Sequence, residues 1–187
     1  MPLLIIPIGF SGSGKTTYYK RNYDPNKTIY ISKDELRIKY CNDINDQSQN
    51  KKIAILSNKI LLKTINDNIY NDKIIIYYDN INIGIFSTIK KYLNDYPTLK
   101  VKILLFMDTL KPQLRMKRIQ KDLDNGIVRA NTIEVIAENY ENEIKQFNSN
   151  VKSIIKYYSM LEDGNDIIER LKVVKLQDGK VMTLYRK

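Results

Sequence analysis

The residues of this chain best suited to do chemistry stand at positions 9–17, which read Gly-Phe-Ser-Gly-Ser-Gly-Lys-Thr-Thr. They fit the pattern G-x-x-x-x-G-K-[ST], in which glycines let successive backbone N–H groups turn toward phosphate oxygens. The positive end of the following helix adds to that field. Lys15 is expected to reach the β- and γ-phosphates, and the Thr16 hydroxyl is expected to hold Mg²⁺. The pattern therefore predicts a cradle for a nucleoside triphosphate, built from Gly12, Ser13, Gly14, Lys15, Thr16 and Thr17.

The context of this motif decides whether it is more than a Gly- and Ser-rich turn. A phosphate loop must follow a buried strand and open a helix. Residues 3–8 are an apolar run, and residues 16–21 can continue as a helix. Both conditions are met, so the segment is interpreted as a strand, a phosphate loop and a helix in succession.

A carboxylate and a guanidinium follow the second β-rich run of the chain, residues 28–31. Asp34 and Arg37 are three residues apart, on one face of a helix that Ser32 and Glu35 are expected to open as a capping box. Since neighbouring strands of an open α/β sheet end at one crevice, Asp34 should face the phosphate loop. Asp34 could act as the base for an acceptor hydroxyl, and Arg37 could grip an acceptor phosphate. The alternatives are an acid that complements a helix N-terminus and a surface arginine that pairs with it.

An acid also ends the third apolar run, residues 74–79. Asp79 is thus predicted at the C-terminal end of a buried parallel strand, the edge at which open α/β sheets bind ligands. Two roles are open for it. It would either order the Mg²⁺ shell or hydrogen-bond the phosphate loop.

Cations gather after the fourth predicted strand, and no acid comes among them before Asp122. They are Lys111, Arg115, Lys117, Arg118 and Lys121. A basic helix of this kind, followed by the turn residues 124–126 and by Arg129, indicates a mobile lid over residues 111–131. The alternative is a solvated basic face of a helix.

The elements expected around these residues alternate along the chain. The remaining predicted elements are helices at 51–70, 83–96, 131 to about 147 and 151–161, a strand at 100–107, and hairpin strands at 171–176 and 181–185. Such alternation predicts an α/β fold, with a parallel sheet flanked by helices on both faces, a helical lid and a C-terminal β-hairpin. The length predicts a single domain over residues 1–187.

The composition indicates the kind of partner and the cellular compartment of the protein. The net charge of +10 favours an anionic partner such as nucleic acid. Cys41 is the lone cysteine, so no internal disulfide can form and a reducing compartment is expected. No apolar run approaches the roughly eighteen residues of a membrane span, and the apolar start lacks a basic leader. We therefore expect a soluble, cytoplasmic protein with no membrane contact.

Missing motifs exclude other users of a phosphate loop. A GTPase would carry N-K-x-D late in the chain and D-x-x-G after the third strand, and the sequence contains neither. Motor ATPases generally need a longer chain and arginine fingers from neighbouring subunits. What remains is phosphoryl transfer to an acceptor, which needs a base for the acceptor hydroxyl and positive charge near the transferred group.

Three segments together resemble the polynucleotide 5′-kinase domain of the phage T4 type. They are residues 6–17, residues 31–37 and the pair Asp79-Asn80, and the similarity extends over most of residues 1 to about 145. The resemblance implies a P-loop kinase fold in which Lys15 and Thr16 bind ATP and Mg²⁺. It further implies that Asp34 is the general base for a 5′-hydroxyl and that Arg37 contacts the acceptor's adjacent phosphate.

In that family the lid also carries arginines that clamp the ATP phosphates in the transition state. The best match to the first is Arg118, which follows Lys117. The place of the second, four residues later, holds Asp122, with Lys121 beside it and Arg129 further along. By resemblance, Arg118 is the expected catalytic lid arginine, and Arg129 is the candidate for the second phosphate contact.

These predictions combine into one expected function and two alternatives. The expected function is transfer of the γ-phosphate of ATP, or of another nucleoside triphosphate, to the 5′-hydroxyl end of RNA or DNA. The first alternative is a P-loop kinase with a small acceptor: a nucleoside, a nucleoside monophosphate, or a nucleotide sugar as in the zeta-toxin group. The second is a nucleic-acid-binding ATPase without an acceptor. Charge is the main feature that separates the expected function from the first alternative, and the sequence carries no signal for the oligomeric state.

Overall fold

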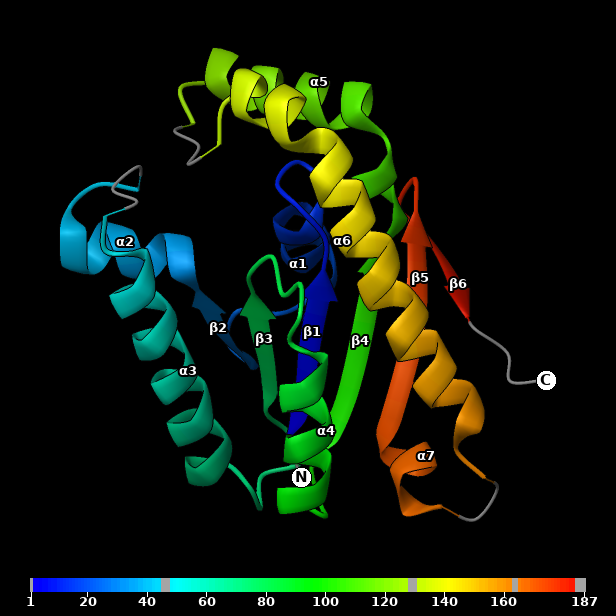
Figure 1. The fold of residues 1–187 in the computed structure, drawn as a ribbon. Helices are drawn as coiled ribbons and strands as arrows, with labels where there is room; N and C mark the ends of the chain where they lie inside the picture. The colour runs from blue at the N-terminus through cyan, green and yellow to red at the C-terminus, as the bar shows by residue number, and fades with distance from the viewer. Residues whose placement is uncertain (1, 45–47, 128–130, 163–164, 184–187) are drawn as a thin grey trace.

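In the computed structural model, which describes residues 2–44, 48–127, 131–162 and 165–183, six strands form one sheet (Figure 1). The strands are β1 (Leu3–Ile8), β2 (Thr28–Ser32), β3 (Ile75–Asp79), β4 (Lys100–Phe106), β5 (Leu171–Gln177) and β6 (Lys180–Thr183). Their order is β2-β3-β1-β4-β5-β6, and every neighbouring pair is parallel except β5 and β6. The predicted α/β fold with a mostly parallel sheet is therefore confirmed.

Helices cover both faces of this sheet. They are α1 (Lys15–Asn22), α2 (Lys33–Cys41), α3 (Asn50–Asp67), α4 (Phe86–Asp95), α5 (Pro112–Asp124), α6 (Ile133–Met160) and α7 (Asp166–Arg170), with a 3₁₀ turn, η1 (Met107–Leu110), after β4. In Figure 1, α3, α4 and α6 lie in front of the sheet and α1 lies behind it. Leu61, Ile89 and Ile154 of the three front helices are fully buried in one apolar core. Tyrosines of α1 pack on a second core at the rear.

The strands form where the sequence is apolar on both faces. Leu4, Ile5 and Ile6 of β1 are fully buried, although successive side chains of a strand point to opposite faces. This is what a parallel sheet covered on both sides requires. Because each such side chain contributes roughly 1.5–3 kcal/mol on burial, β1 is firmly anchored at the point where the phosphate loop leaves it.

One prediction about the helices is wrong. The sequence predicts separate helices at 131–147 and 151–161, but the structure has the single continuous helix α6. The predicted break falls on Asn148-Ser149-Asn150, which are weak helix formers but include no Gly or Pro. Phe147 and Val151, on either side of this tripeptide, are both buried. Packing against the sheet therefore keeps the helix continuous.

The C-terminal hairpin is confirmed, with a tighter turn than predicted. Its loop consists of Asp178 and Gly179, whose φ angles are 50° and 75°. Positive φ at both positions is the type I′ geometry, for which Asp-Gly is a preferred pair. β5 pairs in parallel with β4 and is the predicted fifth strand. Residues 184 and 185 of the predicted last strand lie outside the described residues.

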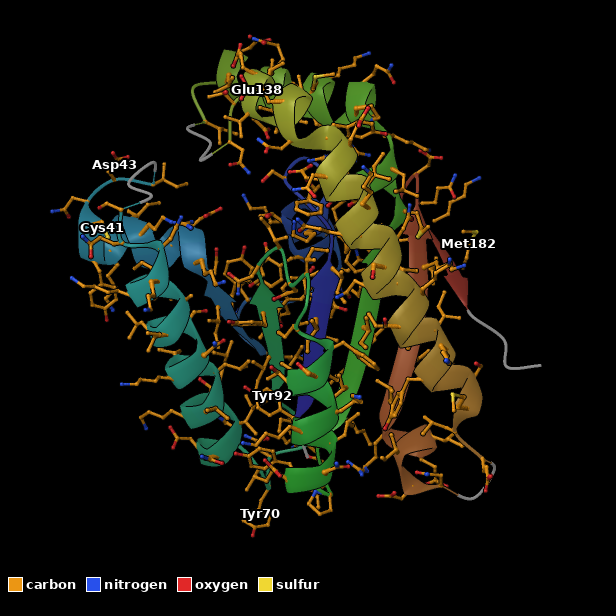
Figure 2. The ribbon with its side chains drawn as sticks, viewed as in Figure 1. Cys41, Asp43, Tyr70, Tyr92, Glu138 and Met182 are labelled. Carbon is orange, nitrogen blue, oxygen red and sulfur yellow. The ribbon has the colours of Figure 1, made fainter. Side chains whose placement is uncertain are left out.

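Single side chains labelled in Figure 2 illustrate how unevenly the aromatic residues are placed. Tyr92 of α4 is buried in the front core, whereas Tyr70, after α3, is exposed. Cys41, at the C-terminal end of α2, is a half-buried free thiol.

Among the helices of the described residues, none has the length and apolar character needed to cross a membrane.

Candidate active site

The phosphate loop joins the C-terminal end of β1 to α1, as the sequence predicts. Gly12 and Gly14 have φ angles of 77° and 99°, in the left-handed region where a side chain is strained. A Cβ atom on Gly12 would also lie 2.8 Å from the backbone oxygen of Arg115. Glycine at these two positions therefore permits the tight turn. Gly14 is the N-cap of α1, so the positive end of that helix begins at the loop.

The Lys15 ammonium lies against its own loop. Nζ donates to the carbonyl oxygens of Gly9 at 2.8 Å and Phe10 at 3.2 Å. The Tyr77 hydroxyl donates to the Lys15 carbonyl at 3.1 Å and ties the start of α1 to β3. These contacts hold the cation beside the loop, where the predicted phosphate contacts require it.

Asp79 is buried at the end of β3, with 7% exposure. Its Oδ2 accepts hydrogen bonds from the Thr16 hydroxyl at 2.7 Å and from the Tyr30 hydroxyl at 2.5 Å. One of the two roles left open for Asp79 was a hydrogen bond to the phosphate loop. The structure has this bond, and its donor is Thr16, the residue directly after Lys15. Burial, and then the charge of Asp79, raises the pKa of Tyr30, so this phenol is a hydrogen-bond donor at neutral pH.

The residues around Thr16 fit a Mg²⁺ ion that is shared with nucleotide phosphates. The Thr16 hydroxyl uses its hydrogen for Asp79, which leaves its oxygen lone pairs for a cation. The buried carboxylate beside it can hold water molecules of the ion's shell. Within the described part of the chain, no group of three or more His, Cys, Asp and Glu side chains makes a metal site by itself. Mg²⁺ in nucleotide enzymes commonly takes few protein oxygens and completes its shell with phosphates and water, so this donor set suffices.

Asp34 and Arg37 form an ion pair on the first turns of α2, with Arg37 Nη1 2.6 Å from Asp34 Oδ1. Ser32 is the predicted N-cap, and its hydroxyl accepts from the backbone N–H of Asp34, one residue earlier than in a capping box. The Arg37 side chain is 11% exposed and the Asp34 side chain 53%. Arg37 is therefore not a surface arginine, although the pairing that the alternative interpretation expected is present.

Asn50, the first residue of α3, is a partner of Arg37 that no sequence pattern predicts. Its Oδ1 accepts from Arg37 Nη2 at 2.6 Å and from Nε at 3.2 Å. This contact joins α2 to α3 and fixes the plane of the guanidinium. The one available signal is the position of Asn50 at the start of an amphipathic helix, which suggests capping rather than a contact with an arginine.

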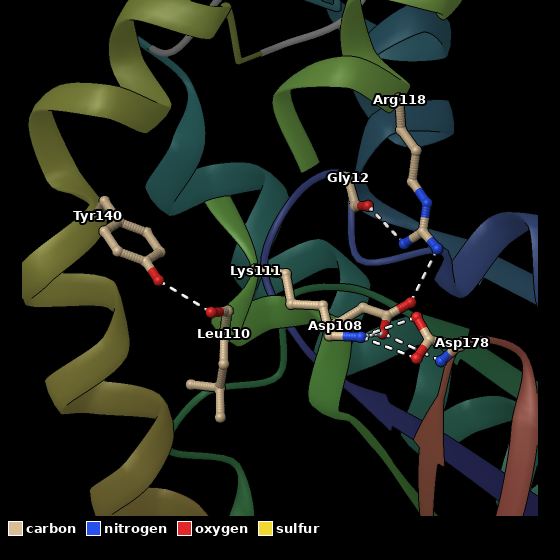
Figure 3. Close-up of polar contacts among 7 residues, drawn as sticks. All are labelled: Gly12, Asp108, Leu110, Lys111, Arg118, Tyr140 and Asp178. Carbon is tan, nitrogen blue, oxygen red and sulfur yellow. Dashed lines mark hydrogen bonds and ion pairs between the residues drawn. The ribbon is translucent and has the colours of Figure 1, made fainter. Parts of the chain in front are cut away.

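Arg118 of α5 lies over the phosphate loop (Figure 3). Its Nη1 donates to the Gly12 carbonyl at 3.2 Å, and its Nη2 donates to Asp108 Oδ2 at 2.8 Å. Asp108 is buried in η1 and also accepts from the backbone N–H of Asp178, in the β5–β6 turn, at 3.1 Å. Lys111 Nζ is 2.8 Å from each carboxylate oxygen of Asp178. One polar network thus joins α5, the hairpin and the phosphate loop.

Arg115, one turn earlier on α5, is a buried residue, and its grouping with the cations of a lid surface is wrong. Its side chain is 0% exposed, and Nη2 lies 2.6 Å from Glu143 Oε2 of α6. Nε donates to the Ser11 carbonyl at 2.8 Å. Burial raises the pKa of Glu143, and the Arg115 charge opposes that shift. The spacing of four residues between Arg115 and the buried Ile119 is the pattern that places Arg115 on the inner face.

Glu35 adds a carboxyl to the α2 side of the site. Partial burial, and then the charges of Asp79 and Asp34, raise its pKa. Burial, and then the nearby Arg37, lower the pKa of Lys33. Glu35 and Asp79 are therefore close enough for their charges to interact, and both line the same cleft. The sequence pattern assigns Glu35 to helix capping alone.

One cleft of about 1520 Å³ brings these groups together. Its lining includes the phosphate loop from Ser11 to Thr17, together with Asp34, Arg37, Asp79 and Arg118. Its lining also includes the C-terminal ends of β2 and β3 and residues of α2 and α5, two helices that Figure 1 shows near that edge of the sheet. Residues predicted for the donor and for the acceptor thus share one cavity. Arg129, the candidate for a second lid contact, lies outside the described residues.

A family model described as an AAA domain matches residues 4–141. The chain belongs to this AAA-domain family. The match spans the phosphate loop, the Asp34–Arg37 pair and Arg118, and with the sheet described above it identifies a P-loop kinase domain. P-loop kinases generally use ATP or another nucleoside triphosphate together with Mg²⁺. The resemblance to the phage T4 type is a finer assignment and stays a prediction.

Solved structures with a similar fold include two kinases. A fungal RNA kinase is 17% identical, with 96% of this chain and 77% of that chain covered and a TM-score of 0.38. The deoxyadenosine kinase from M. mycoides with bound dATP is also 17% identical, with 94% of this chain and 91% of that chain covered and a TM-score of 0.44. No curated protein matches the sequence.

Proposed function

We propose that the chain is a polynucleotide 5′-hydroxyl kinase, which transfers the γ-phosphate of ATP to the 5′-OH end of RNA or DNA. One observation carries this proposal: the Asp34–Arg37 pair and the phosphate loop line the same cleft. A phosphate loop alone would suit a nucleoside triphosphatase of any kind. A carboxylate with a partnered arginine across from that loop supports a second substrate, which offers a hydroxyl and a nearby phosphate.

On the donor side, the loop N–H groups and Lys15 would bind the β- and γ-phosphates of ATP. Lys15 would exchange its contacts with the Gly9 and Phe10 carbonyls for phosphate oxygens. Thr16 would be the protein ligand of Mg²⁺, with Asp79 behind it. Mg²⁺, when bound, supplies positive charge to the β- and γ-phosphate oxygens.

Arg118 is the catalytic arginine of this proposal. It reaches the loop and is one-third exposed to the cleft, so it can leave the Gly12 carbonyl and donate to the γ-phosphoryl oxygens. Negative charge spreads over these oxygens in the transition state, and a guanidinium in place there stabilises it. Arg129 would add a second phosphate contact from the lid, residues 111–131.

On the acceptor side, Asp34 would take the proton of the 5′-hydroxyl as its oxygen attacks the γ-phosphorus. A bond forms between that oxygen and phosphorus, and the bond from phosphorus to the β,γ-bridging oxygen breaks, which releases ADP. Asp34 uses Oδ1 for Arg37 and its side chain is half exposed, so Oδ2 is the oxygen that can receive the proton. Arg37 would hold the carboxylate and bind the adjacent phosphate of the acceptor.

Cations along the cleft support an extended anionic acceptor. Besides Lys15, Arg37 and Arg118, those that line it are Lys20, Arg21, Lys33, Lys51 and Lys121. Together with the net charge of +10, they would attract the backbone of a nucleic acid strand.

A second candidate is a kinase of a small acceptor: a nucleoside, a nucleoside monophosphate or a nucleotide sugar. The confinement of Arg37 favours it. The Arg37 side chain is 11% exposed, and its guanidinium already donates to Asp34 and Asn50. A group so enclosed suits one phosphate close to the reacting oxygen. The two candidates share the donor site and differ in what lies beyond the first nucleoside of the acceptor.

Labelled ATP tests the proposal. The protein is incubated with γ-labelled ATP, Mg²⁺ and one acceptor at a time: a 5′-hydroxyl oligonucleotide of RNA or DNA, the same strand with a 5′-phosphate, or a panel of small acceptors. The proposal expects label on the 5′-hydroxyl strand and none on its 5′-phosphorylated twin. Label on small acceptors alone would establish the second candidate. Phosphate release without any labelled acceptor would indicate an ATPase.

A further inference from the structure

Tyr30 shares the carboxylate oxygen of Asp79 with Thr16. Its hydroxyl donates to Asp79 Oδ2 at 2.5 Å, and the Thr16 hydroxyl donates to the same oxygen at 2.7 Å. Tyr30 comes from β2 and Thr16 from α1, so the buried end of β3 receives hydrogen bonds from two other elements. Oδ2 is thereby supplied with two donors, as a carboxylate oxygen can be.

The ring of Tyr30 is held in place by aromatic neighbours. It stacks on Tyr19 of α1, with ring centroids 4.3 Å apart, and packs near Tyr77 of β3, with centroids 6.0 Å apart. Such pairs restrict the ring to one orientation. The β2–β3 register, in which Tyr30 lies opposite Tyr77, sets the height of the hydroxyl relative to Asp79. Both the sheet and α1 therefore aim this hydroxyl at one oxygen.

We propose that Tyr30 is a positioning residue for the Mg²⁺ site: its hydroxyl fixes Asp79 so that the Thr16 oxygen presents its lone pairs to the metal. The proposal rests on the proposed function only for the presence of a Mg²⁺–nucleotide complex at the phosphate loop. It does not depend on the acceptor.

The physical argument is one of orientation. With Oδ2 fixed by Tyr30, the Thr16 O–H points toward Asp79, and the lone pairs of its oxygen then point away from Asp79. Without the phenol, Asp79 gains freedom to rotate, and the Thr16 hydroxyl has no fixed acceptor. Groups that orient metal ligands in this way commonly change metal affinity by about 10–100-fold.

Tyr30→Phe removes the hydroxyl and keeps the stacked ring. A matched control is Tyr78→Phe, because the Tyr78 hydroxyl is also buried in β3 but donates to Asn58 and accepts from Ser57 of α3. Calorimetry gives the ADP affinity of each protein in EDTA. A Mg²⁺ titration of each protein–ADP complex then gives the half-saturating Mg²⁺ concentration.

For Tyr30→Phe we expect an unchanged ADP affinity in EDTA and a half-saturating Mg²⁺ concentration about tenfold higher than in the wild type. Tyr78→Phe should leave both quantities unchanged. An equal loss of ADP affinity with and without Mg²⁺ would mean that Tyr30 only supports the fold, and an unchanged Mg²⁺ titration would also overturn the proposal.

If Tyr30→Phe does not fold, Tyr30→Met replaces it, since methionine also lacks the hydroxyl and its flexible apolar side chain can fill the space of the ring. The same Mg²⁺-specific loss supports the arrangement, and an unchanged Mg²⁺ titration contradicts it. A wild type that binds Mg²⁺–ADP as expected but labels no oligonucleotide would defeat the proposed acceptor and leave the role of Tyr30 standing.

Discussion

Arg118 donates a hydrogen bond to the carbonyl oxygen of Gly12, 106 positions earlier in the chain, at 3.2 Å. The same guanidinium is paired with the buried Asp108 at 2.8 Å, so Asp108 fixes the orientation of the guanidinium. An arginine held in this way needs only a small shift to reach a phosphate on the loop. Preorganised charge of this kind stabilises a transition state at little cost in reorganisation.

Replacing Arg118 by alanine should slow phosphoryl transfer by about 100- to 1,000-fold in kcat, because the charge that develops on the transferred group loses its guanidinium. The dissociation constant of ADP should change by less than about threefold. Steady-state kinetics and calorimetry measure the two effects. Lys117→Ala, an exposed cation on the same helix, is the matched control and should leave kcat unchanged. An equal loss of kcat in both variants would mean that Arg118 contributes only through general electrostatic attraction.

Asp34→Asn should lower the rate of transfer by about 100- to 10,000-fold, because the amide cannot accept the proton of the acceptor hydroxyl. Binding of ADP should be intact, since Asp34 does not contact the phosphate loop in the structure. Single-turnover transfer with labelled ATP separates the chemical step from product release. Glu35→Gln, on the same turn of α2, tests whether the neighbouring carboxyl is the base instead. A larger loss for Glu35→Gln than for Asp34→Asn would reassign the role.

The buried Arg115–Glu143 pair should matter for stability. Arg115→Met leaves the Glu143 carboxylate buried without its partner and should lower the free energy of unfolding by about 3–5 kcal/mol. The double variant Arg115→Met/Glu143→Leu should recover most of this loss, because an apolar pair carries no desolvation penalty. Denaturant unfolding of the two variants and the wild type measures the difference. A single variant as stable as the wild type would contradict the burial of this pair.

Binding of a polynucleotide acceptor should weaken steeply with salt. Each phosphate that the protein contacts releases counterions, so the KM for an oligonucleotide should rise at least about tenfold between roughly 50 and 200 mM salt. The KM for ATP serves as the internal control and should change much less, because its phosphates bind in the enclosed loop. Parallel, shallow salt dependences for both substrates would argue against a strand along the cations of the cleft.

Local patterns predicted the parts of the site that depend on neighbours in sequence. The loop at residues 9–17 and the pair Asp34 and Arg37 each belong to one turn or one loop, so spacing alone places them. α4 likewise lies within its predicted range, whereas α3 begins one residue before its predicted range and ends three residues short of it. Their positions in one cleft follow from the rule that parallel strands end at a common edge.

Such local patterns could not predict contacts between segments that are distant in the sequence. Asn50 meets Arg37 across 13 positions, Tyr30 meets Asp79 across 49, and Arg115 meets Ser11 across 104. These pairings depend on strand order and helix packing, which no local period encodes. The continuous α6 has the same cause, because burial of Phe147 and Val151 outweighs the weak propensity of the three residues between them.

The length of the acceptor tests the central claim most directly. Acceptors that all carry a free 5′-hydroxyl are compared, from a nucleoside through a nucleoside 3′-monophosphate to oligonucleotides of about two to six residues, and kcat/KM for label transfer is measured for each. The account predicts a rise of about tenfold or more from the nucleoside 3′-monophosphate to the longest strand, as cleft cations engage further phosphates. A value of kcat/KM that is greatest for the nucleoside or the monophosphate, and falls with added residues, would contradict it.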